Sequence, residues 1–255
     1  MAKKNSNLSL FLKSIPIGLA NTLPGISGGT IALVLNIYET LINSIKNIRF
    51  KKLVIIGLGA VLGVYIGSAV ITDLYESSPL LMNYFLFALV LTSAHSTYVK
   101  SGKFTYLKLL YFITAFSAAL FFSLEINLNL NSSGVMLYFA GGFFGSIAMI
   151  LPGISGGTLL VLMGLYYPLL NAVNNFDFVF LSFFALGIAV GLLVFAWIFS
   201  FFLKRYKQHI MSILTGLILG SSAAVFPSAF SIYGLGTFLM GAGLILILEE
   251  IGKRT

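Results

Sequence analysis

Long apolar runs alternate with short polar segments along nearly the whole chain. Six of these runs are long enough to cross a bilayer, because about 20 apolar residues rising 1.5 Å each span its hydrocarbon core. We predict membrane-spanning helices at residues 53–72, 80–99, 106–124, 179–203, 210–226 and 232–249. The pattern therefore predicts an all-α integral membrane protein that forms a single membrane domain over residues 1–255.

The composition excludes a soluble domain. Of the 255 residues, 58% are hydrophobic and 9% are charged, whereas a soluble domain carries about 25% charged residues. There is no cysteine, so no disulfide can form. The basic N-terminal segment lacks the apolar core and small-residue cleavage site of a signal peptide, and we expect it to be retained.

The basic residues are expected to set the membrane topology rather than to bind nucleic acid. The net charge of +8 comes from 15 Lys and Arg residues that gather in clusters between apolar runs. Lys and Arg are retained in cytoplasmic loops. The cytoplasmic side is then predicted to hold both termini and residues 43–52, 100–105 and 204–209, and the outer side residues 73–79, 125–133, 174–178 and 227–231.

The octapeptide LPGISGGT occurs twice, at residues 23–30 and 151–158, which is an offset of 128. We predict two copies of one unit, residues 8–125 and 134–251. Because three spans follow each octapeptide, the copies are expected to have inverted topology, as in alternating-access transporters. The same offset pairs Tyr38 with Tyr166, Gly59 with Gly187 and Gly63 with Gly191, and these glycines are expected to allow close helix packing.

The segments that contain the octapeptides, residues 8–45 and 134–173, are too long for one straight span. By the charge rule, each begins and ends on the same side of the membrane. Proline lacks an N–H and glycine tolerates any backbone angle, so the octapeptide is expected to break the helix. We predict two re-entrant helical hairpins, one from each face. The alternative is one tilted crossing per segment, which would put later loops on the wrong side.

The break is expected to face a cavity, because unpaired backbone in hydrocarbon costs several kcal/mol per group. The helix that follows presents free N–H groups and partial positive charge, and the Ser and Thr residues add hydroxyl donors. Such a cradle favours a phosphate or carboxylate; helix capping is the alternative role for the Ser and Thr side chains. The predicted binding residues are Asn21, Pro24, Gly25, Ser27, Gly28, Gly29, Thr30, Pro152, Gly153, Ser155, Gly156, Gly157 and Thr158.

Glu39 is the one carboxylate within either octapeptide segment, and Tyr167 stands at its place in the second copy. Carboxylates inside membranes often couple transport to ions, so Glu39 is a candidate for coupling to H⁺ or Na⁺. A position at the cytoplasmic interface is the alternative. His95, at the end of a span, is expected to be an interfacial polar residue, with pH sensing as the alternative. No cofactor, metal site or catalytic residue is expected.

The segments NTLPGISGGTIALVLNIYETLI and AMILPGISGGTLLVLMGLYYPLL resemble the paired signatures of the bacterial domain-of-unknown-function family 368, the polyprenyl-phosphate transporters. The resemblance covers essentially the whole chain. It implies transport, without enzymatic chemistry, of undecaprenyl phosphate from the outer to the inner leaflet of the cytoplasmic membrane, where the carrier is recycled for cell-envelope glycan synthesis. It matches Glu39 with the family's acidic position. Thr92, His95 and Tyr167 depart from the family pattern.

Three alternatives stay open. An undecaprenyl-diphosphate phosphatase shares inverted repeats and a similar motif, but that motif continues with an Arg and is accompanied by paired intramembrane glutamates. Here PGISGGT has no Arg, and only Glu39 is near. A carrier of a small soluble anion predicts a closed central vestibule, whereas a lipid carrier predicts a groove open sideways to the bilayer. An accessory subunit predicts no transport by the isolated protein. Membrane lipids are expected partners, and the protein is a candidate for forming a homodimer.

Overall fold

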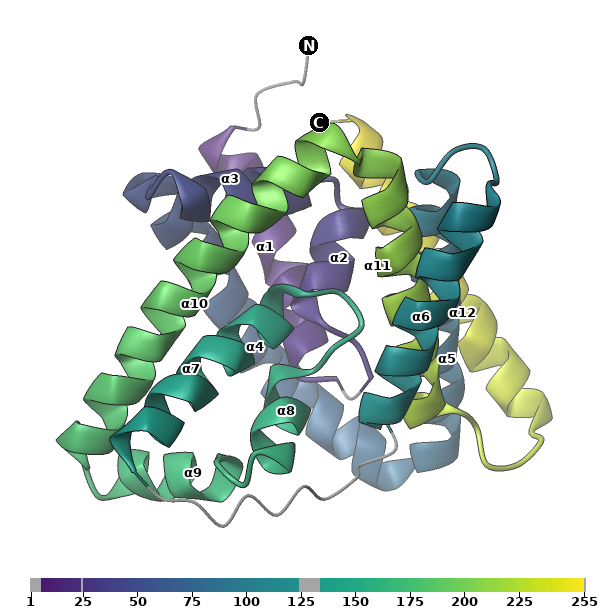
Figure 1. The fold of residues 1–255 in the computed structure, drawn as a ribbon. Coiled ribbons are helices and arrows are strands. Elements are labelled where there is room, and N and C mark those ends of the chain that lie inside the picture. Colours follow the sequence, from purple (N-terminus) through teal and green to yellow (C-terminus); the bar gives the residue numbers. More distant parts are fainter. Residues whose placement is uncertain (1–5, 24, 124–133, 255) are drawn as a thin grey trace.

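The computed structural model describes residues 6–23, 25–123 and 134–254, without the side chains of residues 69–76 and 254. These residues form α-helices and one 3₁₀ helix, and no strand occurs among them (Figure 1). In chain order the helices are α1 (Asn7–Asn21), α2 (Gly28–Val34), α3 (Tyr38–Lys46), α4 (Phe50–Ser77), α5 (Pro79–Val99), α6 (Tyr106–Ser123), α7 (Val135–Ile150), α8 (Gly156–Leu162), α9 (Tyr166–Asn174), α10 (Phe178–Arg205), α11 (Lys207–Ser221), η1 (Ser222–Val225) and α12 (Ile232–Arg254).

Six segments of the described chain are helical, long and apolar enough to cross a membrane, which confirms the predicted spans. They lie in α4, α5, α6, α10, α11 with η1, and α12. The multi-pass, all-helical membrane architecture predicted from the apolar runs is therefore confirmed. The helices α8 and α9 would together pass the same test, but they are bent by 101° at the short break between them.

The order of helices recurs along the chain. The bounds of α2, α3 and α4 reappear in α8, α9 and α10 after the same 128 residues that separate the octapeptides, as from Gly28 to Gly156. Figure 1 shows α3 at the end of the molecule where both termini lie, and α9 at the opposite end. The helices α3 and α9, each the second short helix after an octapeptide, therefore lie at opposite ends of the molecule (Figure 1).

Glycines bring two helix pairs into close contact. The helix α1 packs along α4, and α7 packs along α10. A Cβ atom at Gly63 would lie 2.0 Å from the backbone oxygen of Ile15, and one at Gly191 would lie 2.5 Å from that of Phe143. No side chain fits at either position, so these glycines serve the close approach that the sequence predicted.

The remaining long helices pair across the two halves of the chain. The helix α5 packs along α12, and α6 packs along α11. Buried side chains from both halves, among them Leu86, Leu214 and Ile245, belong to one hydrophobic core. In Figure 1 these four helices stand on the right, while α4, α7 and α10 stand on the left with α1 and α2 between the groups.

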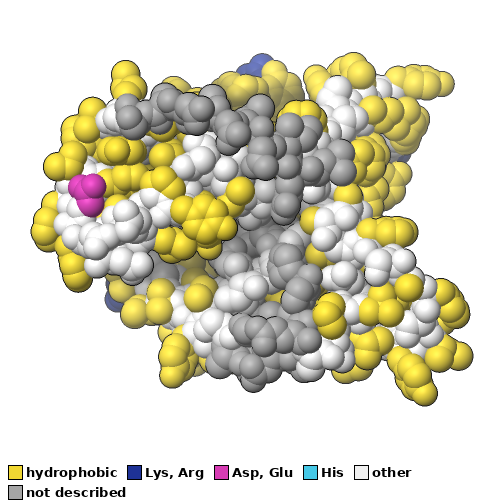
Figure 2. Space-filling view, turned by 90° about the horizontal axis from the view of Figure 1, so that it is seen from below, with side chains coloured by type: hydrophobic (Ala, Val, Ile, Leu, Met, Phe, Trp, Pro, Cys, Tyr) yellow, Lys and Arg dark blue, Asp and Glu magenta, His cyan; other side chains and the backbone are white. Residues whose placement is uncertain are grey.

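Charged contacts concentrate at the end where the termini lie. Lys207 of α11 forms an ion pair with Glu39 of α3 there, and Lys253 pairs with Glu249 on α12. Figure 2 shows the opposite end, where the described side chains are mainly hydrophobic or uncharged, and basic groups appear only at the margins. Among the described side chains, the ion pairs thus lie at the end of the molecule where the termini are.

Candidate functional site

The two octapeptide loops meet in the interior of the protein. Ser27 Oγ donates a hydrogen bond to the backbone oxygen of Leu151 at 3.3 Å and accepts one from the N–H of Gly153 at 3.3 Å. Gly29 lies so close to the second loop that a Cβ there would be 2.2 Å from the backbone oxygen of Ile150. The start of α2 is therefore packed directly against the loop that precedes α8.

The first octapeptide uses its polar groups internally. Ser27 is the N-cap of α2, and its hydroxyl accepts a hydrogen bond from the N–H of Thr30 at 3.3 Å. The N–H of Gly28 donates to Asn21 Oδ1 at 2.8 Å. Both Ser27 and Thr30 are buried. The expectation of free amides is therefore wrong for Gly28 and Thr30, because Asn21 and Ser27 cap the helix.

The second octapeptide is more open. Ser155 caps α8 by accepting from the N–H of Thr158 at 3.3 Å, but the amides of Gly156 and Gly157 make no hydrogen bond within the described chain. Met149 stands where the first copy has Asn21, so no side-chain acceptor reaches Gly156. Identical sequences thus present different chemistry, since the amide of Gly156 has no partner among the described residues whereas that of its counterpart Gly28 is bound to Asn21.

Residues of both octapeptides line one polar pocket of about 520 Å³, which we call the motif pocket. The Ser221 hydroxyl of α11 lies at its wall and donates to the backbone oxygen of Gly25 at 3.2 Å. Among the described residues, no Lys, Arg, His, Asp or Glu lines the motif pocket. Its polar lining residues and motif glycines are Asn21, Thr22, Gly25, Ser27, Ser123, Gly153, Ser155, Thr158 and Ser221.

The predicted binding residues divide into three groups. Asn21, Gly25, Ser27, Gly153, Ser155 and Thr158 line the motif pocket. Gly28, Gly29, Thr30 and Pro152 are buried behind it. Gly156 and Gly157 face a neighbouring groove. Pro24 lies outside the described residues.

Sequence reasoning missed three hydroxyl-bearing residues of the motif pocket, Thr22, Ser123 and Ser221. A signal existed for Ser221, because the 128-residue offset pairs it with Ser93 in the other half. Ser93, however, is buried elsewhere in α5, without a hydrogen-bond partner among the described residues. The 128-residue offset alone would therefore have placed both serines at a pocket, whereas only Ser221 lines the motif pocket.

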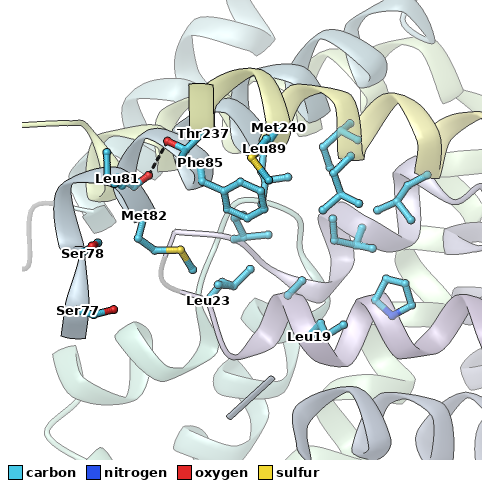
Figure 3. A pocket seen from close by; sticks show the side chains of 17 residues that line it. Leu19, Leu23, Ser77, Ser78, Leu81, Met82, Phe85, Leu89, Thr237 and Met240 are labelled. Atoms are coloured by element: carbon cyan, nitrogen blue, oxygen red, sulfur yellow. Dashed lines mark hydrogen bonds between the residues drawn. The ribbon is translucent and has the colours of Figure 1, made fainter. Parts of the chain in front are cut away.

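Two apolar grooves adjoin the motif pocket. The first, of about 870 Å³, is lined by α3, α4, α7 and α10, and we call it the α4–α10 groove. The second, of about 600 Å³, lies between α1, α5 and α12, and we call it the α5–α12 groove (Figure 3). Its Thr237 hydroxyl donates to the backbone oxygens of Leu81 and Gly234, both at 3.0 Å, so this groove offers no free hydroxyl there.

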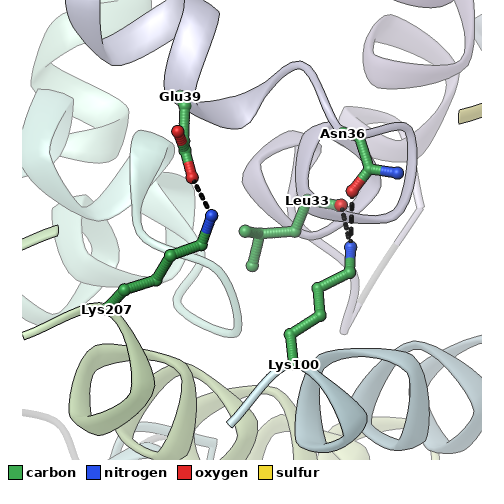
Figure 4. A network of polar contacts seen from close by, with 5 residues as sticks. All are labelled: Leu33, Asn36, Glu39, Lys100 and Lys207. Atoms are coloured by element: carbon green, nitrogen blue, oxygen red, sulfur yellow. Dashed lines mark hydrogen bonds and ion pairs between the residues drawn. The ribbon is translucent and has the colours of Figure 1, made fainter. Parts of the chain in front are cut away.

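Glu39 lies apart from the motif pocket, at the charged end of the molecule. Its carboxylate pairs with Lys207 Nζ at 2.6 Å, and both side chains are about half exposed (Figure 4). Within the described residues, no cluster of three or more His, Cys, Asp or Glu side chains has the arrangement of a metal site. His95 is exposed on α5 and lines a separate pocket with Lys108.

Lysines hold the carboxyl end of α2 at the same charged end. Lys100 Nζ donates to the backbone oxygen of Leu33 and to Asn36 Oδ1, both at 2.8 Å (Figure 4). Lys13 Nζ donates to the backbone oxygen of Leu35 at 3.2 Å. Cations stabilise the carboxyl end of a helix, where backbone oxygens lack partners. Gly141 and Ser228 stand 128 residues after these lysines, and among the described residues no lysine donates to a backbone oxygen of α8.

Comparisons with known proteins agree with this architecture. A family model described as VCA0040-like, undecaprenyl phosphate translocase-like, matches residues 17–55 and 46–234. A polyprenyl-phosphate transporter of Vibrio cholerae serotype O1 is 33% identical over 248 residues, covering 89% of this chain and 80% of the relative. A polyprenyl-phosphate transporter of Staphylococcus aureus is 28% identical over 242 residues, covering 85% of each chain. No solved structure matches the chain.

Proposed function

Because the chain belongs to the VCA0040-like, undecaprenyl phosphate translocase-like family, we propose that it carries undecaprenyl phosphate from the outer to the inner leaflet of the bacterial cytoplasmic membrane. The lipid would then be reloaded for cell-envelope glycan synthesis. Both curated relatives bear the name of a transporter rather than of an enzyme. We therefore propose a membrane transporter that moves the lipid without making or breaking a covalent bond.

The observation that carries the proposal is the motif pocket, which both octapeptides line together. Phosphate oxygens accept hydrogen bonds, and the hydroxyls of Ser155 and Thr158 lie at this pocket as donors. The amides of Gly156 and Gly157, which line the adjoining α4–α10 groove next to Ser155, have no acceptors among the described residues. A charge at the centre of a bilayer is costly, so donors at this depth lower the barrier for the headgroup.

The absence of a cation from the described lining suits a carrier. Hydrogen bonds between charged and neutral groups are worth about 1.5–3 kcal/mol each, and a lysine or arginine would add a strong ionic attraction. Neutral donors bind the phosphate less tightly and so permit its release on the far side.

Topology is the second part of the proposal. Since α3 lies at the charged end with both termini, and basic loops face the cytoplasm, we place that end in the cytoplasm. The opposite position of α9 (Figure 1) supports inverted repeats, and the packing of α8 back against α7 across the second octapeptide supports a re-entrant second hairpin. Movement of one copy relative to the other would then expose the motif pocket to each leaflet in turn.

The test is a proteoliposome assay of how much polyprenyl phosphate can be reached from each leaflet. We expect the native protein to move the lipid and Gly156→Leu to block it, because a Cβ at Gly156 already lies 2.9 Å from the backbone oxygen of Gly145. Gly243→Leu is the control, since a Cβ there meets nothing within 4 Å. Normal transport by Gly156→Leu would refute binding of the phosphate at the start of α8.

The same vesicles separate lipid from solute transport. Native protein that takes up labelled inorganic phosphate and leaves polyprenyl phosphate in its original leaflet would overturn the proposed substrate. Transport of neither would point to an accessory role. Each result is distinct from the effect of the Gly156 substitution.

A further inference from the structure

We infer that the α4–α10 groove carries the isoprenoid tail of the lipid while the motif pocket holds its phosphate. This inference rests on the proposed function and adds the path of the tail to it. The occupant is a long unsaturated hydrocarbon chain attached to a phosphate, rather than a second protein or an ordinary membrane lipid.

The α4–α10 groove is continuous with the motif pocket. Ser27 and Ser155, one from each octapeptide, line both spaces, and so do Ile26 and Ile154. Gly157 lines the groove, and a Cβ there would meet only Ser155 Oγ, at 3.7 Å. A phosphate at Ser155 therefore has its attached chain at the mouth of this groove without crossing any intervening element.

The groove lies between two long helices that do not seal it. Within the described residues, α4 packs on α1 and α10 packs on α7, but α4 and α10 do not pack on each other. The helix α3 contacts both of them and closes the groove toward the charged end. Gly57 of α4 lines the groove, is exposed, and would have no neighbour within 4 Å of a Cβ. The wall is therefore open to the side.

A side opening matches the chemistry of the tail. Apart from the polar groups near the octapeptides, the groove is lined by apolar side chains such as Leu53, Ile188 and Leu192. A hydrocarbon chain loses no hydrogen bonds when it leaves lipid for such a surface, whereas the phosphate needs donors throughout. The tail can therefore remain partly in the bilayer while the headgroup moves, which a closed vestibule would prevent.

The α5–α12 groove is the competing path, and its contacts favour it less. It shares Leu23 and Ile26 with the motif pocket, but no residue of the second octapeptide lines it. A tail placed there would approach the phosphate from the first octapeptide, where Asn21 and Ser27 already occupy the amides of Gly28 and Thr30. The open donors of the second octapeptide face the α4–α10 groove instead.

Photo-crosslinking tests the path directly. The full chain carries the photoreactive residue p-benzoylphenylalanine at position 57, 244 or 236, and sits in phospholipid vesicles with radiolabelled undecaprenyl phosphate. Leu244 lines the α5–α12 groove, and Gly236 of α12 is exposed outside both grooves. We expect several-fold more labelling at 57 than at 244 or 236, and we expect excess unlabelled undecaprenyl phosphate to suppress it.

Two crosslinking results would overturn the inference. Strongest labelling at 244 would assign the tail to the α5–α12 groove. Equal labelling at all three positions, unaffected by competitor, would mean that the lipid is only part of the surrounding bilayer.

A transport measurement gives an independent readout. Gly57→Phe fills open space in the groove, and Gly236→Phe fills open space on α12, so both variants are expected to fold. We expect Gly57→Phe to slow the transport of undecaprenyl phosphate several-fold. The transport of farnesyl phosphate, which has a much shorter tail, should be slowed less. Gly236→Phe should leave both rates unchanged. Unchanged rates in Gly57→Phe would refute the tail path alone, whereas native protein that moves neither lipid would refute the proposed function.

Discussion

The hydroxyl of Ser27 accepts a hydrogen bond from the backbone N–H of Gly153 at 3.3 Å, although 126 residues separate the two along the chain. This contact joins the two octapeptides, and it is not reciprocal. Ser155, the counterpart of Ser27, caps its own helix and faces the motif pocket. Substitutions at matched positions of the two octapeptides should therefore have unequal effects.

Gly29 and Gly157 are the clearest matched pair. We expect Gly29→Ala to destabilise the protein by about 1–3 kcal/mol, the usual cost of overpacking, because its Cβ would lie 2.2 Å from the backbone oxygen of Ile150. Gly157→Ala should leave the stability nearly unchanged, since its Cβ has only Ser155 Oγ nearby, at 3.7 Å. Thermal unfolding in detergent measures both, and equal shifts of the midpoint would contradict the close packing of the loops.

Asn21 should stabilise the first octapeptide as a capping residue. We expect Asn21→Leu to cost about 1 kcal/mol, as the loss of a helix cap usually does, because the N–H of Gly28 would lose its acceptor at 2.8 Å. The same unfolding assay measures this loss. Asn21→Asp, which keeps an acceptor oxygen, is the control and should retain most of the stability.

Met149→Asn tests whether the free amides of the second octapeptide bind phosphate. An amide oxygen at position 149 would occupy the N–H of Gly156 in the way that Asn21 occupies that of Gly28. We expect the variant to fold but to bind polyprenyl phosphate more weakly. The measurement is the increase in unfolding temperature on adding the lipid, since a ligand stabilises the state that it binds. An undiminished increase would exclude the Gly156 amide from the site; Met149→Leu is the control.

Substitutions of Glu39 and Lys207 distinguish two roles for Glu39, a structural ion pair and the binding of a coupling ion. Exposed ion pairs contribute about 0.2–1 kcal/mol, so Glu39→Gln should change the unfolding temperature little. If the pair only joins α3 to α11, the exchange Glu39→Lys with Lys207→Glu should restore transport lost in either single variant. If Glu39 carries a coupling ion, Glu39→Gln should abolish ion-driven transport and the exchange should not rescue it.

The helices and the breaks between them were accessible from the sequence because both depend on local properties. The apolar runs are long enough to predict each span, and Pro and Gly in the octapeptides predict where the helices stop. Ser27 and Ser155 were expected near the start of the next helix, and each is the N-cap there.

The different hydrogen bonding and burial of the two octapeptides could not be predicted from their identical sequences, because both depend on residues outside them. Asn21 in one copy and Met149 in the other decide whether the first amide is free, and Ser27 is buried in tertiary contacts with Leu151 and Gly153. Lys13 and Lys108 are basic residues, for which exposure is the usual expectation, yet both are buried. Their long side chains reach backbone oxygens, such as that of Ser101 at 2.7 Å from Lys108 Nζ.

The pairing of long helices across the two halves of the chain has a consequence for biosynthesis. Since α5 packs on α12 and α6 packs on α11, the first half of the chain emerges from the ribosome before the surfaces that cover it exist. Neither half should form a stable unit when it is produced alone, and co-production of the two fragments should restore a folded protein. The two halves of the chain would then complete each other's fold.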